Sequence, residues 1–184
     1  MIRVMGIDPG SVVTGYGVIE TDGIRSFHLA NGHLRLAGGS FVERLGDVHR
    51  RLAALLDEWQ PAEVAVEEVF ISNNAMSALK LGQARGAVIT AVVARDIPVS
   101  EYAARQVKQV VTGTGGAAKS QVQRMICSHL AIAEPLQSDA ADGLAVALCH
   151  AHSRTANRLA AAAGSGARVG RRRGGRGSGR GLRR

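Results

Sequence analysis

The hydrophobic positions change their spacing along the chain. Three short apolar runs come first, bounded by glycine, proline and aspartate, and they predict strands at residues 2–7, 12–20 and 24–36. Asp22-Gly23 supplies a hairpin turn between the second and third strands. Gly15 and Gly17 lie within the second strand, which indicates that another backbone approaches it closely.

Helical spacing begins after Ser40, which has the spacing of a capping box with Glu43. Apolar residues then recur at helical intervals, at Leu45, Val48, Leu52, Leu55 and Leu56. Later helices are expected over 74–95 (capped by Asn73 or Asn74), 103–111, 121–130 and 138–152. The apolar runs 64–66 and 97–99 between these helices predict strands. The run 64–66 is interpreted as a strand buried on both faces, which favours parallel pairing in an α/β fold.

Two of these strands carry an acidic residue at their end. Asp8 follows the first strand, and Glu67 follows the strand at 64–66. Ligands of open sheets bind beyond the carboxyl ends of parallel strands, and a carboxylate buried alone is costly, so a bound cation is one explanation. Two simpler explanations stay open: Asp8 opens an Asp-Pro-Gly turn, and Glu67 is a solvated strand end.

Asp139 and Asp142 lie three residues apart, on one face at the start of the last predicted helix. Capping and the helix dipole favour acids there, but two acids on one face can also complete a metal site. If all four carboxylates converge, their repulsion favours hard cations such as Mg²⁺ or Mn²⁺. Two ions about 4 Å apart can activate water and stabilise the leaving oxygen in phosphodiester hydrolysis. His150 and His152 are interpreted as ordinary residues of the helix end.

Length and composition fit one folded domain. The chain has 184 residues, of which 46% are hydrophobic. No stretch approaches the roughly 20 apolar residues of a membrane span, and the start lacks the features of a signal peptide. Cys127 and Cys149 have no metal-binding spacing and are interpreted as buried thiols of a cytoplasmic protein.

The net charge of +8 is concentrated at the C-terminus. Ten of the 23 basic residues are arginines beyond Ser153, where no acidic residue occurs, so the rest of the chain is slightly acidic. We therefore expect a folded domain over residues 1–152 and a disordered Gly/Arg-rich basic tail over residues 153–184. Such a tail either binds nucleic acid without sequence preference or only aids solubility.

Three further features have alternative explanations. Phe70, just past an acidic strand end, is either a packing anchor or an exposed stacking platform. Gly82 and Gly86 share a helix face and permit close approach of the sheet or of a second subunit. The segment 113–120 nearly matches a phosphate-binding loop but lacks one required glycine and follows a helix. We expect no nucleotide cofactor, although this loop can hold another phosphate at Lys119.

Four blocks in order resemble the RuvC family of Holliday junction resolvases, which have a ribonuclease H-like fold. They are GIDPGSVVTGYGVIE, AVEEVFISNNAMSALKLGQARG, QVKQVVTGTGGAAKSQVQ and SDAADGLAVALCHAH, and the similarity extends from residue 1 to about residue 152. The resemblance implies a mixed sheet flanked by helices, with three antiparallel strands followed by parallel ones. It also implies that the catalytic and metal-binding acids are Asp8, Glu67, Asp139 and Asp142.

The same resemblance implies a Mg²⁺-dependent crossover junction endodeoxyribonuclease with two ions per active site, in which Mn²⁺ can substitute. A homodimer nicks four-way DNA junctions symmetrically during recombination and repair, leaving 5′-phosphate and 3′-hydroxyl ends. The RuvA–RuvB branch-migration complex is the implied protein partner. Phe70 matches an aromatic residue proposed to stack on a base, and Lys108 and Lys119 match basic positions implicated in DNA contact. The basic tail is not covered by the resemblance.

Two other classes of protein share part of this pattern. Gly-Ile-Asp-x-Gly-Ser also resembles the first phosphate motif of sugar-kinase and actin-like ATPases, but those need two such domains and about twice this length. A non-catalytic, junction-binding architectural protein would keep the lysines without needing four acids. Metal-dependent cleavage distinguishes that class from a resolvase.

Overall fold

The computed structural model describes residues 1–68, 74–133 and 136–169, with side chains described as far as Arg154. The strands are β1 (Ile2–Asp8), β2 (Val13–Thr21), β3 (Ser26–Arg35), β4 (Glu63–Glu68) and β5 (Val99–Ala103). The helices are α1 (Phe41–Trp59), α2 (Ala75–Val93), α3 (Ala104–Thr112), α4 (Lys119–His129) and α5 (Ser138–Val169). Every strand and helix expected from the sequence is therefore present.

The five strands form one mixed sheet in the order β3-β2-β1-β4-β5. β1, β2 and β3 pair antiparallel, whereas β4 pairs parallel with both β1 and β5. The predicted fold class is confirmed. Because β1 and β4 are parallel neighbours, with Ile7 opposite Val66, both strands end at the same edge of the sheet.

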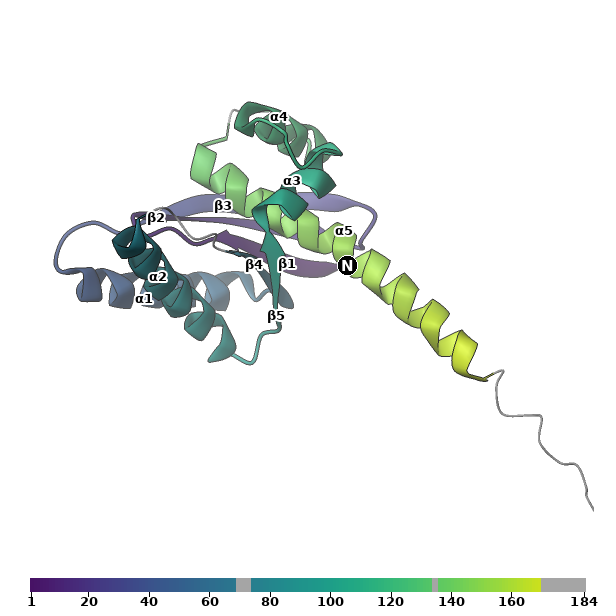
Figure 1. Ribbon diagram of the computed structural model, residues 1–184, viewed down its shortest axis with the longest axis horizontal. Helices are drawn as coiled ribbons and strands as arrows, with labels where there is room; N and C mark the ends of the chain where they lie inside the picture. Colours follow the sequence, from purple (N-terminus) through teal and green to yellow (C-terminus); the bar gives the residue numbers. More distant parts are fainter. Residues whose placement is uncertain (69–73, 134–135, 170–184) are drawn as a thin grey trace, which may run out of the picture.

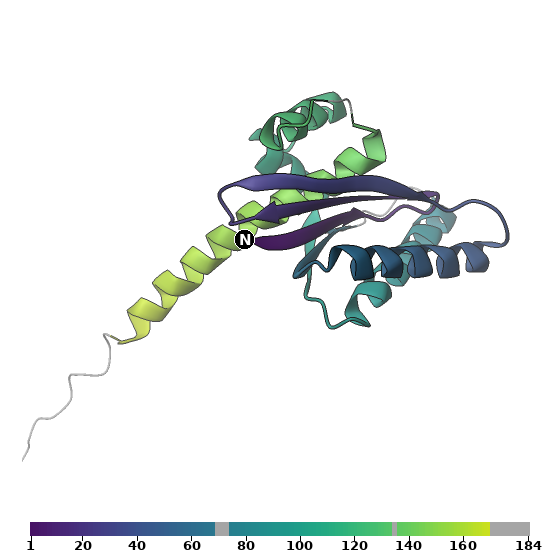
Figure 2. The ribbon, with the colours of Figure 1, turned by 180° about the vertical axis from the view of Figure 1, so that it is seen from behind.

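Helices cover both faces of this sheet (Figures 1 and 2). α1 and α2 pack on one face, where Met5 and Leu52 belong to a common core. α3, α4 and α5 cover the other face, where Val4 packs in a second core with Leu144. Val4 and Met5 are adjacent in β1 and point to opposite faces, as the alternation of a strand requires. β1 is thus a central strand buried on both sides.

Local signals in the sequence explain where the first two helices begin. The Ser40 hydroxyl accepts a hydrogen bond from the Glu43 N–H at 3.3 Å, and the Glu43 carboxylate accepts one from the Ser40 N–H at 2.6 Å. This is the predicted capping box. Asn74 caps α2 by accepting hydrogen bonds from the N–H groups of Met76 and Ser77.

α5 approaches the sheet closely because glycines remove side chains from the contact. A Cβ atom at Gly6 of β1 would collide with the backbone of Ala147, and one at Gly17 of β2 would collide with Leu144. A Cβ at Gly143 of α5 would in turn collide with the backbone of β2. The close approach predicted at the second strand is therefore confirmed, and the backbone that approaches is that of α5.

The last helix is longer than expected. α5 continues past His152 to Val169, so the predicted end of this helix at about residue 152 is wrong (Figure 1). The stretch from Ala156 to Ala163 consists largely of alanine, leucine and arginine, which are strong helix formers, and the first glycine after it is Gly164. Residues 170–184 of the predicted tail lie outside the described residues. No described helix combines the length and apolar character that spanning a membrane requires.

Candidate active site

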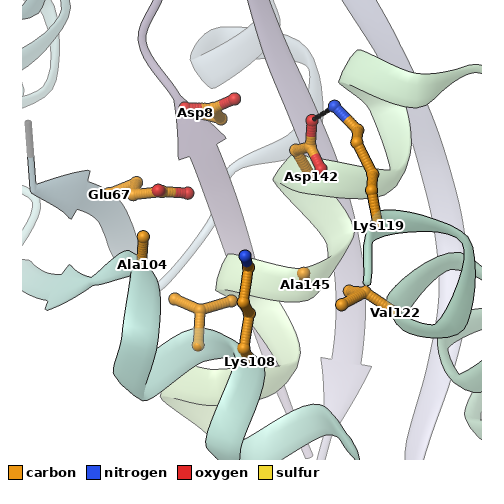
Figure 3. A pocket seen from close by; sticks show the side chains of 9 residues that line it. Asp8, Glu67, Ala104, Lys108, Lys119, Val122, Asp142 and Ala145 are labelled. Atoms are coloured by element: carbon orange, nitrogen blue, oxygen red, sulfur yellow. Dashed lines mark hydrogen bonds and ion pairs between the residues drawn. The ribbon is translucent and has the colours of Figure 1, made fainter. Parts of the chain in front are cut away.

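The candidate site lies at the edge of the sheet where β1 and β4 end (Figure 3). Asp8 is the last residue of β1, and Glu67 is the last but one of β4. Because these strands are parallel neighbours, the two carboxylates emerge beside each other. Both line a pocket of about 250 Å³.

Asp142 reaches the same pocket from α5. The helix lies so close to β2 that a Cβ at Gly15 would collide with the backbone oxygen of Asp139. This contact holds the first turns of α5 against the carboxyl edge of the sheet. The structure thus brings three of the four predicted acids to one pocket, whereas Asp139 does not line it.

The three carboxylates are difficult to ionise together. Burial raises the pKa of Asp8 to about 6, and the charges of Asp142 and Asp139 add to this effect. Burial likewise raises the pKa of Glu67 to about 7, with further contributions from Asp8 and Asp142. Burial also raises the pKa of Asp142, against the opposing effect of Lys119. Such a group of acids favours a bound cation, which stabilises the ionised forms.

Two lysines bring positive charge to the acidic pocket. Lys108 extends from α3, and Lys119 is the first residue of α4 (Figure 3). The Lys119 Nζ lies 2.6 Å from Asp142 Oδ2 in a hydrogen-bonded ion pair. The remaining lining residues are apolar: Ala104, Val107, Val122 and Ala145. The pocket therefore combines oxygen ligands for cations with ammonium groups suited to phosphate.

The donor set fits a hard divalent cation, because Mg²⁺ and Mn²⁺ prefer carboxylate and water oxygens. Within the described residues, no three Asp, Glu, His or Cys side chains already stand close enough to hold an ion together. Asp142 is bound to the Lys119 ammonium, so its carboxylate would exchange that partner for a cation. The arrangement suits metal-assisted hydrolysis of a phosphodiester, in which bound cations stabilise the attacked phosphate and positive side chains contact neighbouring phosphates.

Two further residues, Glu68 and Phe70, follow Glu67 closely in the chain. Glu68 is exposed and does not line the pocket, whereas Glu67 does. Phe70 lies outside the described residues, and the choice between stacking and packing stays a prediction.

The loop containing residues 113–118 joins α3 to α4, so it follows a helix and lacks the strand that a nucleotide-binding loop requires.

Sequence reasoning missed a polar cluster at the other end of β4. His150, interpreted as an ordinary residue of the helix end, is only 4% exposed, and its Nε2 lies 2.6 Å from Glu63 Oε2. Glu63 also accepts a hydrogen bond from Arg154. The spacing of His150 and Arg154, four residues apart on one helix face, was the only local signal of this cluster.

A mixed sheet in this strand order, with acids at the ends of β1 and β4 and on the helix that crosses them, defines a ribonuclease H-like protein. Comparison with known proteins narrows this class. The family model of crossover junction endodeoxyribonuclease RuvC matches residues 4–150. The chain belongs to the RuvC family.

Individual relatives agree with this assignment. The crossover junction endodeoxyribonuclease RuvC of Pelobacter propionicus is 52% identical over 163 residues, which cover 88% of this chain and 93% of that relative. The protein of the same name from Xylella fastidiosa is 56% identical over 162 residues, covering 86% and 94%. A solved structure of Thermus thermophilus RuvC in complex with Holliday junction substrate superposes with a TM-score of 0.81 at 36% identity, covering 85% and 97%.

Proposed function

We propose that this protein is a metal-dependent endonuclease that resolves four-way DNA junctions by paired symmetric nicks during recombination and repair. The observation that carries the proposal is the pocket in which Asp8, Glu67 and Asp142 meet Lys108 and Lys119. Water attacks the phosphodiester in line, which leaves a 5′-phosphate and a 3′-hydroxyl.

Asp8, Glu67 and Asp142 would hold Mg²⁺, with Asp139 at the margin available to complete the ligand set. When bound, two such ions supply an activated water and stabilisation of the leaving oxygen, and Mn²⁺ is expected to substitute. The raised pKa values of Asp8 and Glu67, caused chiefly by burial, mean that a cation must compete with protons for these side chains. Cation affinity is therefore expected to rise between about pH 5 and pH 8.

The lysines would hold the DNA backbone at this site. Lys108 and Lys119 come from different helices and border the pocket beside the acids, so their ammonium groups can contact phosphates next to the scissile one. Release of Lys119 from Asp142 would free one ammonium for this contact. These contacts position the strand and carry no sequence information.

Paired nicks need two active sites, so we infer a twofold homodimer. A Cβ at Gly82 or Gly86 would meet no described atom within 4 Å, so these glycines of α2 do not pack on the sheet. Met76, Leu79 and Val93 of the same helix are 60%, 56% and 55% exposed. Spacings of three, four and seven residues place these positions along one side of α2, which is a suitable surface for the second subunit.

Two parts of the proposal concern partners beyond the junction itself. The arginine-rich end of the chain, residues 170–184, would add contacts to any DNA through release of counterions. Membership of the RuvC family supports cooperation with the RuvA–RuvB branch-migration complex on chromosomal DNA in the cytoplasm.

A cleavage assay tests the proposed function. A synthetic four-way junction with end-labelled arms is incubated with the protein in EDTA, in Mg²⁺ and in Mn²⁺, beside a linear duplex of the same sequence. The expected products are paired nicks at symmetric positions of the junction, formed only with a metal ion. Metal-independent binding without any cleavage would instead identify a junction-binding architectural protein.

A further inference from the structure

The polar cluster at the start of β4 links that strand to α5. Glu63 begins β4, and both of its carboxylate oxygens are occupied: His150 Nε2 lies 2.6 Å from Oε2, and Arg154 Nε lies 2.8 Å from Oε1. The hydroxyl of Tyr102 on β5 lies 2.9 Å from His150 Nδ1. The cluster therefore joins two strands to one helix. Glu63 lies at the start of β4, away from the candidate active site, whereas Tyr102 is paired with Glu67 in the sheet.

Both carboxylate oxygens of Glu63 and both ring nitrogens of His150 have hydrogen-bond partners within the cluster. Because the Glu63 carboxylate accepts from Nε2, the Nδ1 of a neutral His150 ring accepts from the Tyr102 hydroxyl. Burial works to raise the pKa of Glu63, but the hydrogen bonds from His150 and Arg154 outweigh it and lower the pKa. Glu63 is therefore an ionised carboxylate held between two donors that lie one helical turn apart.

The glycine contacts with β1 and β2 fix how closely α5 approaches the sheet, but the other contacts around His150 are mostly apolar and have little directional preference. The buried residues near His150 on this helix are otherwise apolar: Leu144, Ala145, Val146, Ala147, Leu148, Cys149 and Ala151. Such surfaces hold the helix against the sheet, but hydrogen bonds to a charged group restrict its position much more sharply, because they depend on distance and angle. The polar cluster therefore adds a directional restraint on the position of α5 along β4.

The two elements joined by the cluster are the ones that carry catalytic acids. Glu67 lies four residues after Glu63, about 13 Å along the strand at roughly 3.3 Å per residue. Asp142 lies eight residues before His150, about 12 Å along the helix at 1.5 Å per residue. The spans agree, and α5 runs antiparallel to β4. A link at one end therefore places Asp142 opposite Glu67 at the other.

We propose that Glu63, His150 and Arg154 are positioning residues, which fix α5 along β4 so that Asp142 stands at the correct height beside Glu67. The proposal rests on the proposed function, because it assigns those two acids to the active site. It predicts that cation binding and cleavage depend on a cluster that touches neither the cation nor the DNA.

His150→Leu tests the proposal, because leucine removes the donor to Glu63 while filling much of the same space. A displacement of about 1 Å at a reacting group can cost about 100-fold in rate, so we expect single-turnover cleavage to fall about 10- to 100-fold. Mn²⁺ affinity, measured by calorimetry on the metal-stripped protein without DNA, is expected to fall as well. The affinity for the junction in EDTA is expected to stay within about twofold, since phosphate contacts dominate it.

Three further variants separate positioning from general destabilisation. His150→Gln retains a side-chain N–H donor to Glu63 and is expected to restore most of the rate and of the Mn²⁺ affinity. His152→Leu, at an exposed position on the same helix, should change neither. Val48→Ala, in the core on the opposite face, should lower the melting midpoint and leave both readouts unchanged at temperatures where it is folded.

The proposal is wrong if His150→Leu melts earlier but binds Mn²⁺ and cleaves like the wild type, or if Val48→Ala loses both activities to the same extent. If His150→Leu does not fold, Arg154→Ala provides the same comparison at a partly exposed position. A wild-type protein that does not cleave the junction would contradict the proposed function. The positioning role would then be judged on Mn²⁺ affinity alone.

Discussion

Replacing Asp8 by asparagine is expected to stabilise the metal-free protein while abolishing cleavage. The substitution keeps the shape of the side chain but removes one charge from the pocket shared with Glu67 and Asp142. Burial, with help from neighbouring carboxylates, raises the pKa of Asp8 from 3.8 to about 6. Ionisation of Asp8 in the folded protein therefore costs free energy that a neutral amide does not.

The size of this effect follows from the raised pKa. The rise from 3.8 to about 6 corresponds to about 3 kcal/mol at 1.36 kcal/mol per pKa unit. An amide keeps part of the cost of burial, so we expect a gain of about 1–2 kcal/mol, or about 2–8 °C in melting midpoint for a chain of this size.

The gain in stability of Asp8→Asn over the wild type should depend on pH in a defined direction. In the unfolded chain Asp8 ionises near 3.8, whereas in the folded protein it ionises near 6. The wild type therefore loses stability as the pH rises between these values and carries the full penalty above pH 6. The advantage of Asp8→Asn should be largest at about pH 8 and mostly absent at about pH 4.

Thermal unfolding followed by circular dichroism in EDTA at both pH values measures this difference. Excess Mn²⁺ should then raise the midpoint of the wild type and leave that of Asp8→Asn unchanged. Glu68→Gln is the control, because this exposed glutamate does not line the pocket, and its stability should change by no more than about 0.5 kcal/mol. If Asp8→Asn melts at or below the wild-type midpoint at the higher pH, or gains the same stability at both pH values, ionisation of Asp8 does not destabilise the folded protein.

Three further substitutions or deletions test other parts of the account. Gly86→Leu is expected to shift the dimer toward monomer in light scattering without loss of the fold, because no described atom lies within 4 Å of a Cβ there; an intact dimer would remove α2 from the interface. Phe70→Ala should slow single-turnover cleavage by about one to two decades and bind junctions well, since base stacking is worth roughly 1–3 kcal/mol. An unchanged rate with a lowered melting midpoint would instead assign Phe70 to the core. Deletion of residues 170–184 should weaken binding to all DNA forms and flatten its salt dependence. Unchanged affinity for linear duplex at low salt would leave that segment as a solubilising extension.

The parts of the site predicted from the sequence depend on local signals. Asp8 and Glu67 each follow a short apolar run, and parallel pairing of those strands places both at one edge of the sheet. Gly15 and Gly17 indicated a close backbone neighbour because a strand interior gains nothing from glycine unless space is short. These inferences needed only spacing, burial and residue size.

The parts that could not be predicted depend on how distant elements meet. Asp139 and Asp142 share a helix face by spacing, but the rotation of α5 against β2 decides that Asp142 lines the pocket and Asp139 does not. The contact between His150 and Glu63 joins residues 87 positions apart. The length of α5 is not evident from composition, because its alanine-rich continuation leads directly into the arginine-rich end of the chain.

The central claim is that the carboxylates of this pocket perform metal-dependent cleavage of a four-way junction. Glu67 and Glu68 are adjacent in β4, but only Glu67 lines the pocket. The most direct measurement is therefore single-turnover cleavage of an end-labelled junction in Mg²⁺ by Glu67→Gln and Glu68→Gln, with junction affinity measured in EDTA for both. The account predicts that Glu67→Gln binds the junction but does not cut it, while Glu68→Gln cuts at nearly the wild-type rate. Cleavage by Glu67→Gln at the wild-type rate, or equal losses in both variants, would contradict it.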